Sequence, residues 1–185
     1  MYLPSDDTFL IADCVKQYHG QWALEIGVGS GLILEVLERN FINVVGSDIS
    51  LHVLEHCRSR TRAMLVCCDA ASAFAGSFDL IVSNPPYLPD ENNNTDNYDH
   101  HCDKIKDLTV HGGPAGIETT IHFIDSALPL LAQDGKMLFV VSSLANIADL
   151  YSLLATETKR MHKKVLKEKR LFYETLSVIE LSISQ

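Results

Sequence analysis

The chain lacks three features that would each assign it to a class of protein. None of its apolar runs is long enough to cross a membrane, and its first residues have neither the basic segment nor the apolar core of a signal peptide. Its five cysteines are odd in number and none has Cys-x-x-Cys spacing. This argues against a disulfide framework and against a zinc site. We therefore expect reduced thiols, no metal, and a location in the cytoplasm, with the nucleus as a second compartment.

An excess of basic residues is absent as well. The net charge of the 185 residues is −9, whereas binding to duplex nucleic acid draws most of its affinity from basic residues on phosphates. The one basic run lies within residues 159–170, and we interpret it as solvating the terminal strands rather than contacting ribosomal RNA. The charge argues against direct nucleic-acid binding and favours a basic protein or peptide surface as partner.

Strand and helix patterns alternate along the chain, which is the signature of an α/β protein with a mostly parallel sheet. We find no repeat, linker or internal boundary, and we expect one domain, residues 1–185. Strands are predicted at 22–26, 43–47, 63–67, 78–83 and 136–142, and helices at 5–19, 32–39, 51–59, 117–131 and 144–157. Ser5 is the predicted N-cap of the first helix. Residues 161–169 and 171–183 are predicted to add an antiparallel pair to one edge of the sheet.

A glycine-rich turn follows the first predicted strand. It reads Glu25-Ile26-Gly27-Val28-Gly29-Ser30-Gly31, and its three alternating glycines let the backbone turn tightly and approach a ligand closely. No Lys-Ser/Thr pair follows the glycines, so the turn is not a P-loop. Glu25 would place a negative charge beside a pyrophosphate, and it suits a cationic ligand instead. The turn therefore predicts a cofactor site for a nucleoside that carries a positive charge.

Two further acids follow the next two strands. Asp48 ends the second predicted strand, and an acid at this distance from the glycines hydrogen-bonds ribose hydroxyls in dinucleotide-type folds. Asp69 follows the third strand, where its carboxylate suits an adenine amino group, with the backbone amide of Ala70 beside it. The alternative is that Glu25 and Asp48 only cap turns. We give that alternative the smaller weight, because all three acids fall at successive strand ends.

The tetrapeptide Asn84-Pro85-Pro86-Tyr87 follows the fourth predicted strand. Two prolines can neither extend a strand nor start a helix there, and the residue before a proline is held extended. Asn84 is therefore expected in a stiff turn at the carboxyl end of a strand, which is where open α/β sheets bind ligands. A side-chain amide, proline carbonyls and an aromatic face form a suitable clamp for a planar group that carries an NH2.

Together these residues resemble the class I S-adenosylmethionine-dependent methyltransferases of the HemK/PrmC type, which methylate the side-chain amide nitrogen of a glutamine. Tyr2-x-Pro4-Ser5-Asp6-Asp7-Thr8-Phe9-Leu10 and His111-Gly112-Gly113-Pro114-Ala115-Gly116 are similar to segments of the eukaryotic and archaeal branch. That branch acts on the Gly-Gly-Gln glutamine of class 1 translation termination factors. Its eukaryotic members work with a small zinc-binding activator subunit. The helical N-terminal domain of the bacterial enzymes has no counterpart in this sequence, and His111 stands where the family often has an aromatic residue.

The resemblance implies the fold, the cofactor and the site. The fold would be a seven-stranded Rossmann-like sheet in the order 3-2-1-4-5-7-6, and the cofactor S-adenosyl-L-methionine. The cofactor-binding residues would be Thr8, Glu25, Gly27, Gly29, Gly31, Asp48, Asp69, Ala70 and Asn84. Asn84, Pro85, Pro86 and Tyr87 would form the catalytic clamp on the substrate amide. The methyl group would then pass in line to the amide nitrogen, without a general base.

The same strand order would leave the strand within Ala63–Cys68 on an edge. This segment is apolar and uncharged, whereas proteins usually protect a free edge with charges, prolines or bulges. We expect the small zinc-binding subunit to add a strand there, unless another part of this chain covers it.

Other hypotheses stay open at this stage. The acidic segment 90–103 is either a lid over the substrate or a solvated insertion, and its Asp99-His100-His101-Cys102-Asp103 lacks the spacing of a metal site. An adenine-N6 methyltransferase of nucleic acid is one alternative function, because the Asn84 clamp also suits the adenine amine. A non-catalytic subunit that binds the cofactor is the second.

Overall fold

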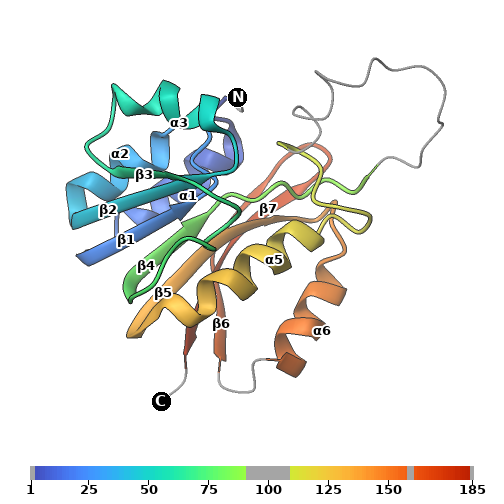
Figure 1. Ribbon diagram of the computed structural model, residues 1–185. Coiled ribbons are helices and arrows are strands. Elements are labelled where there is room, and N and C mark those ends of the chain that lie inside the picture. The colour runs from blue at the N-terminus through green and yellow to red at the C-terminus, as the bar shows by residue number, and fades with distance from the viewer. Residues whose placement is uncertain (1–2, 91–108, 158–160, 184–185) are drawn as a thin grey trace.

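The computed structural model describes residues 3–90, 109–157 and 161–183 (Figure 1). These residues form one seven-stranded sheet between two layers of helices. The strand order is β3-β2-β1-β4-β5-β7-β6, and β7 runs antiparallel to both of its neighbours, β5 and β6. The pairings β1 with β2, β2 with β3, β1 with β4 and β4 with β5 are all parallel. The predicted fold class is therefore confirmed.

The strands lie close to the predicted positions. Their bounds are β1 Gly20–Ile26, β2 Phe41–Asp48, β3 Met64–Cys67, β4 Phe78–Ser83, β5 Leu131–Ser142, β6 Met161–Arg170 and β7 Thr175–Ile183. β5 begins five residues before the predicted start at 136, and its ladder with β4 is irregular between Phe78 and Leu80. The extra residues follow the short 3-10 helix η1 (Leu128–Leu130) without a loop, which sequence periodicity did not reveal.

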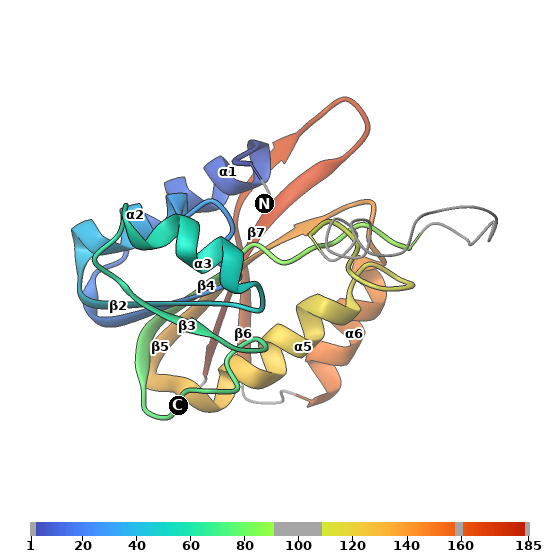
Figure 2. The same ribbon diagram turned by 45° about the horizontal axis from the view of Figure 1, so that its top comes forward.

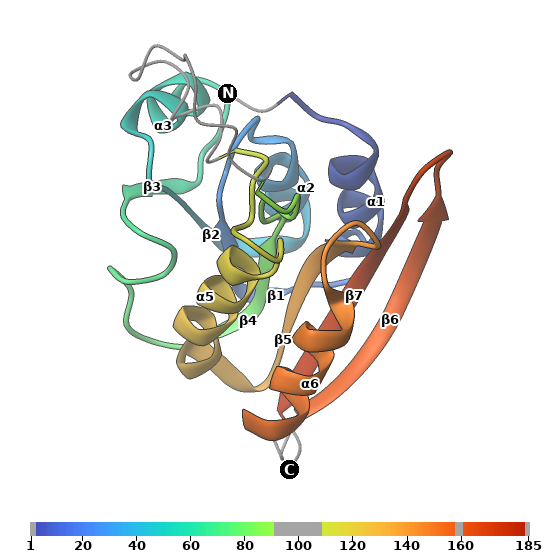
Figure 3. The ribbon, with the colours of Figure 1, turned by 90° about the vertical axis from the view of Figure 1, so that its right-hand side faces the viewer.

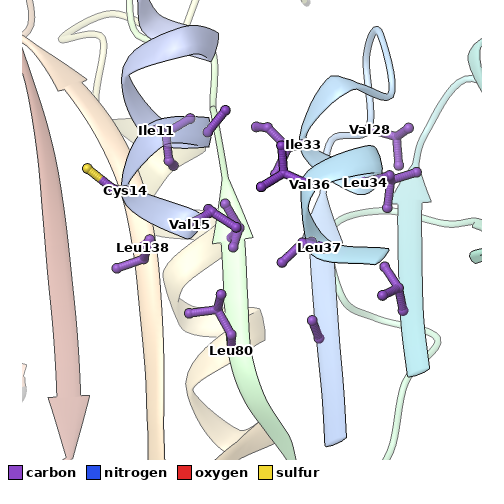
Figure 4. Close-up of a cluster of buried hydrophobic side chains, with 14 of the residues drawn as sticks. Ile11, Cys14, Val15, Val28, Ile33, Leu34, Val36, Leu37, Leu80 and Leu138 are labelled. Atoms are coloured by element: carbon purple, nitrogen blue, oxygen red, sulfur yellow. The ribbon is translucent and has the colours of Figure 1, made fainter. Parts of the chain in front are cut away.

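The helices cover the two faces of the sheet. α1 (Asp6–Val15), α2 (Leu32–Asn40) and α3 (Leu51–Arg58) lie on one face, and α5 (Glu118–Ala127) and α6 (Ile147–Glu157) lie on the other (Figure 3). The first face is packed by Ile11, Val15, Leu34 and Leu37 against the sheet (Figure 4). No helix among the described residues is long and apolar enough to span a bilayer.

The central strands are buried on both faces, because helices cover both sides of the sheet. Successive residues of a strand point to opposite faces. Leu138 accordingly joins the core under α1 and α2, while Met137 and Phe139 join the core under α5 and α6. All three side chains are fully buried. This explains why these strands read as continuous apolar runs in the sequence.

Three predicted helix ends were wrong. The first helix ends at Val15 rather than residue 19, because Gln17 and Tyr18 close it with hydrogen bonds to Cys14 and Val15 carbonyls. The helix predicted over 117–131 ends at Ala127, and the 3-10 helix η1 (Leu128–Leu130) follows, with a proline in its first turn. α6 begins at Ile147 rather than 144, because the Asn146 side chain accepts the Asp149 amide and caps the helix.

Candidate active site at the carboxyl edge of the sheet

The carboxyl ends of β1, β2, β3 and β4 meet at one edge of the sheet, because these strands are parallel and adjacent. Glu25 lies near the end of β1, Asp48 ends β2, Asp69 comes two residues after β3, and Asn84 follows β4. The sequence-predicted residues thus come from four strands to a single edge. Figure 2 shows β2, β3 and β4 of this part of the sheet. Their roles toward a ligand stay predictions.

The glycine turn after β1 has the left-handed backbone that only glycine adopts without strain. The φ angles of Gly27, Gly29 and Gly31 are +77°, +50° and +79°. The Gly27 and Val28 amides donate to the Ser47 carbonyl of β2, at 2.8 and 3.1 Å, which fixes the turn against the neighbouring strand. The chain then enters α2 directly after Gly31. We call Gly27–Gly31, together with Glu25, Asp48 and Asp69–Ala70, the glycine cradle.

Asp48 holds this cradle together. Its Oδ2 accepts the Gly29 amide at 3.3 Å and its Oδ1 accepts the Ser50 amide at 2.8 Å. The turn-capping interpretation of Asp48, which was given the smaller weight, is therefore correct for the protein by itself. It does not compete with a role in binding, since an ionised carboxylate offers about four acceptor sites.

Glu25 is buried, at 1% exposure, and its Oε2 has no hydrogen-bond partner. Burial raises the pKa of this carboxyl well above its ordinary value, the Asp48 charge raises it further, and a hydrogen bond from the Leu34 backbone opposes the shift. An incompletely bonded carboxyl is costly in a protein interior. A cation or a hydrogen-bond donor of a ligand would give the Glu25 Oε2 atom the partner that it lacks. The cradle therefore fits S-adenosylmethionine, which carries a positive charge.

The segment after β3 forms the far side of the cradle. Ala70 has φ +47°, the one positive φ of a non-glycine residue among those the structure describes, and Ser47 Oγ holds its carbonyl at 2.8 Å. Asp69 Oδ1 lies 2.8 Å from Nε2 of His122 on α5. The sequence analysis missed His122, because it described α5 only as a helix and the pair is 53 positions apart.

The Asn84 side chain projects from the carboxyl end of β4. Its Nδ2 donates to Thr8 Oγ1 at 3.4 Å, while its buried Oδ1 has no partner. Among the described residues, Asn84 Oδ1 and Glu25 Oε2 are the two buried side-chain polar atoms left without a hydrogen bond. The amide is thus held by its nitrogen and presents a free acceptor oxygen.

Asp7, to which the sequence analysis assigned no role of its own, organises this half of the site. It is 2% exposed. Its Oδ1 accepts the Thr8 amide at 2.5 Å and the Thr8 hydroxyl at 3.1 Å, and its Oδ2 accepts the Tyr87 hydroxyl at 3.1 Å. Ser5 is the N-cap residue of α1, as predicted, and its hydroxyl donates to Asp7 Oδ1 at 3.0 Å rather than accepting a backbone amide. The signal for this role lay in the segment containing Asp7 and Thr8, which the family resemblance had already singled out.

The His111–Gly116 segment packs on the backbone after Asn84. Leu88 donates to the Val110 carbonyl at 2.9 Å and accepts the Gly112 amide at 2.8 Å. A Cβ on Gly112 would lie 2.4 Å from the Pro86 oxygen, and one on Gly116 would lie 2.4 Å from the Tyr87 oxygen. His111 Nδ1 lies 3.2 Å from the Pro89 oxygen, so it holds this loop by a polar contact. We call residues 84–89 with this segment the Asn84 loop.

Two predictions fall largely beyond these residues. The acidic segment 90–103, apart from Asp90, lies outside the described part of the chain, as do Asp99–Asp103. Within the described part, no three His, Cys, Asp or Glu side chains form a group that could hold a metal ion.

The strand order, the glycine cradle and the strand-end acids together define a class I S-adenosylmethionine-dependent methyltransferase domain. Residues 24–85 match a family model described as a methyltransferase domain. Solved structures share the fold. A chain of the E. cuniculi Mtq2–Trm112 complex, described as responsible for methylation of the eRF1 translation termination factor, matches with TM-score 0.75 at 24% identity, over 99% of this chain and 98% of that one. The T. thermophilus 16S rRNA N2 G1207 methyltransferase RsmC, in complex with AdoMet and guanosine, matches with TM-score 0.68 at 18% identity, over 100% and 44% of the two chains.

Curated proteins similar in sequence to this chain include glutamine methyltransferases. A release factor glutamine methyltransferase of Bradyrhizobium diazoefficiens is 34% identical over 128 residues, which are 62% of this chain and 41% of the relative. A provisionally named protein N5-glutamine methyltransferase of Methanocaldococcus jannaschii is 28% identical over 150 residues, 78% of this chain and 73% of the relative. The chain thus spans about two fifths of the bacterial relative's length. Its sequence is similar to those of protein glutamine methyltransferases.

Proposed function

We propose that this chain is the catalytic subunit of a protein-glutamine N5-methyltransferase that uses S-adenosylmethionine and acts on the Gly-Gly-Gln glutamine of a class 1 translation termination factor. The observation that carries the proposal is the buried Asn84 Oδ1, which has no partner and lies at the same strand edge as the glycine cradle. The names of the curated relatives support the same reaction.

The free oxygen of Asn84 fits an amide nitrogen as substrate. It accepts one N–H of the glutamine amide, and the Pro85 carbonyl is the candidate acceptor for the other. Because the Thr8 hydroxyl and the buried Asp7 hold Asn84 by its nitrogen, its oxygen is oriented before the substrate arrives. Tyr87, held by Asp7, would pack beside the amide plane, and Pro86 keeps the turn stiff.

The chemistry needs orientation more than proton abstraction. When bound, S-adenosylmethionine supplies an electrophilic methyl group on its sulfonium. The amide nitrogen is a poor nucleophile, so the two acceptors direct its lone pair toward the cradle and hold it there. Such positioning can lower a barrier by about 7–11 kcal/mol when the alignment is good. Once the amide nitrogen has gained the methyl group, it loses one N–H proton to solvent. The transfer therefore needs no general base.

Glu25 and Asp48 would hold the cofactor in this scheme. Glu25 offers a buried negative charge to the cationic end, and Asp48 keeps acceptor capacity for ribose hydroxyls while it caps the turns around it. Asp69 and the strained Ala70 would meet the adenine, with His122 fixing the Asp69 carboxylate. Single-domain organisation of residues 1–185 and a cytoplasmic location remain part of the proposal.

The edge strand β3 is the proposed seat of a small zinc-binding partner. β3 is the outermost strand at its end of the sheet, and it is short, uncharged and partly exposed, with Met64 at 51%. A strand from the partner would pair with its free backbone groups and cover Met64. The complex that contains the structural neighbour supports a partner of this kind.

The deciding experiment is transfer of labelled methyl from S-adenosylmethionine to a purified class 1 termination factor. It is run with the natural factor and with a Gly-Gly-Gln glutamine-to-alanine variant, each with and without the small zinc-binding subunit. Label that depends on the glutamine supports the reaction. Label on DNA or RNA instead would replace it with adenine methylation, and cofactor binding without transfer to either would favour a non-catalytic subunit.

A further inference from the structure

The β6–β7 hairpin presents an aromatic pair to solvent. Phe172 is 102% exposed and Tyr173 is 73% exposed. Both lie in the turn between the strands, and Figures 2 and 3 show the hairpin standing out beyond the sheet beside α1. Aromatic residues and arginine are enriched in the centres of protein interfaces, and Arg170 precedes this turn. We call residues 170–173 the hairpin tip.

The hairpin tip is held in one conformation by hydrogen bonds on both sides of the aromatic pair. The Leu171 amide donates to the Glu174 carbonyl across the turn at 2.8 Å. The Ser142 hydroxyl donates to the Glu174 carboxylate at 2.5 Å, and the Thr175 amide donates to Ser143 Oγ at 2.8 Å. These bonds order the backbone on either side of the pair, and a turn whose backbone is already ordered loses less conformational entropy when a partner binds it.

The tip lies at the same edge of the sheet as Asn84. Leu176, the second residue of β7, pairs with Ser142, the last residue of β5, so the turn before β7 is at the carboxyl edge. Lys169 Nζ contacts Asp6 Oδ1 at 2.8 Å, and Asp6 is the neighbour of the Asp7 that holds Tyr87. Phe172 is three residues beyond Lys169, and three residues span at most about 11 Å. A protein that inserts its glutamine at Asn84 would therefore reach the tip.

A groove of about 570 Å³ extends this surface along the base of the hairpin, between α1, α2 and β6. Its lining includes the apolar side chains of Phe9, Leu32 and Val36, with Lys169 among the charged ones. Phe9 is 54% exposed, although it lies on α1 between buried neighbours. The hairpin side of the groove is charged, through Lys167, Glu168 and Lys169, and its apolar side chains come from α1 and α2.

The charges near the tip favour a protein over a nucleic acid. Three of the four lysines of β6 are engaged, since Lys167 and Lys169 pair with Asp13 and Asp6 and Lys163 lies over the Tyr151 ring. Arg170 is the cation at the tip that forms no ion pair with any described residue. Binding of a nucleic acid requires several cations in contact with phosphates. A single guanidinium, by contrast, can bind one carboxylate of a protein in a bidentate pair.

We propose that the hairpin tip docks the protein whose glutamine is methylated, by placing Phe172 and Tyr173 in an apolar socket that has a carboxylate beside it for Arg170. This inference rests on the proposed function, and it assigns the tip to substrate recognition rather than to chemistry. The tip sets the affinity for the folded protein substrate, while Asn84 and the cradle set the rate of transfer.

The test uses the double variant Phe172→Ala/Tyr173→Ala with the small partner subunit present. We expect KM for the termination factor, and the Kd for its unreactive glutamine-to-alanine form, to rise about tenfold or more. The kcat at saturation and the Kd for S-adenosylmethionine should not change. Arg170→Ala should give a smaller rise. The matched control is Ile42→Ala, which removes a 71% exposed apolar side chain at the start of β2 and should change nothing. Unchanged KM and Kd in the double variant would overturn the inference.

A second measurement tests the same inference if the double variant folds poorly. A photo-crosslinking amino acid in place of Tyr173 should attach to the termination factor in a mixture that also contains RNA. Attachment to RNA alone, or to neither, would overturn the docking inference. If the wild-type complex gives no glutamine-dependent label, the proposed function itself fails. If it labels normally and the tip variants match it, the docking inference alone fails.

Discussion

The glycine cradle and the Asn84 loop occupy the same sheet edge but are held in place by different means. The cradle is fixed by backbone geometry within short stretches, through three left-handed glycines and through amides that meet the Ser47 carbonyl and the Asp48 carboxylate. The Asn84 loop is fixed by contacts between residues far apart in the sequence, since Asp7, Gly112 and Gly116 all pack on residues 84–89. Each half leaves one buried oxygen without a partner. Cofactor binding and methyl transfer should therefore respond to different substitutions.

The largest separation of the two functions is expected from Asn84→Ala. It removes the free acceptor that would orient the substrate amide, so kcat should fall by about 10²–10³ or more. The Kd for S-adenosylmethionine should stay within a few-fold, because the cradle does not depend on this side chain. Single-turnover transfer and calorimetric cofactor binding measure the two effects.

Asn43→Ala is the matched control, since it also removes an amide that donates a single hydrogen bond, to the Gln21 carbonyl at the start of β1. It should leave both quantities unchanged. Asp7→Asn is a graded version, which weakens the acceptors for Thr8 and Tyr87 and should lower kcat less than Asn84→Ala does. Loss of cofactor binding in Asn84→Ala, with transfer per bound cofactor intact, would contradict the assignment.

These two regions also differ in how much the sequence revealed. The cradle could be predicted because three alternating glycines after a strand dictate a local turn, and the strand order brings Asp48 and Asp69 beside it. The position of Asn84 could be predicted because two prolines end β4. Its orientation could not, since the bond from Tyr87 to Asp7 joins residues 80 positions apart.

The predicted end of the first helix was wrong for the same reason. Tyr18 leaves the predicted helix to donate to Glu180 Oε2 of β7 at 2.5 Å, a contact across 162 positions that no local pattern contains. Burial is the main cause of the raised pKa of Tyr18, and the Glu180 hydrogen bond adds to it. The pairing of His122 with Asp69 was likewise invisible to periodicity, which places a residue on a helix face and does not name its partner.

A smaller effect, confined to the Asn84 loop, is expected from Gly116→Ala. Its Cβ would lie 2.4 Å from the Tyr87 oxygen and 3.0 Å from the Pro89 nitrogen, and its φ is +74°. The Asn84 loop must move to make room for the Cβ of the new alanine. A displacement of about 1 Å at a reacting centre costs about 10²-fold in rate. We expect kcat to fall by up to that factor, with cofactor affinity retained.

The control variant Gly76→Ala separates the steric clash of a new Cβ from the strain of a positive φ angle. Gly76 also has a positive φ, +121°, but a Cβ there meets nothing within 4 Å. It should lose about 1–2 kcal/mol of the free energy of unfolding and keep its activity. Equal kcat values for the two variants would show that the Gly116 contact does not position the Asn84 loop.

The smallest effect on turnover, and the most specific for the cradle, is expected from Glu25→Gln. The Kd for S-adenosylmethionine should weaken about tenfold or more, since a hydrogen bond to a charged group contributes about 1.5–3 kcal/mol. The kcat at saturating cofactor should change little. Glu55→Gln, at an exposed position of α3, is the matched control and should bind the cofactor normally. Glu25→Gln with unchanged cofactor affinity would remove Glu25 from the site.

The pH dependence of the cradle follows from the direction of the Glu25 pKa. Burial raises this pKa in the folded protein above the unfolded value of about 4.3, so the folded state binds the proton more tightly. The resulting stabilisation is complete below the unfolded pKa and is lost as pH rises through the folded pKa. Thermal unfolding without cofactor should therefore show a fall in stability over that window, and the fall should be absent in Glu25→Gln.

A cationic ligand favours the ionised carboxylate of Glu25, so S-adenosylmethionine should release a proton on binding and bind more tightly as pH rises toward the folded pKa. Calorimetry in buffers of different ionisation enthalpy measures that proton, and its absence in the wild type would mean that the cation does not meet Glu25.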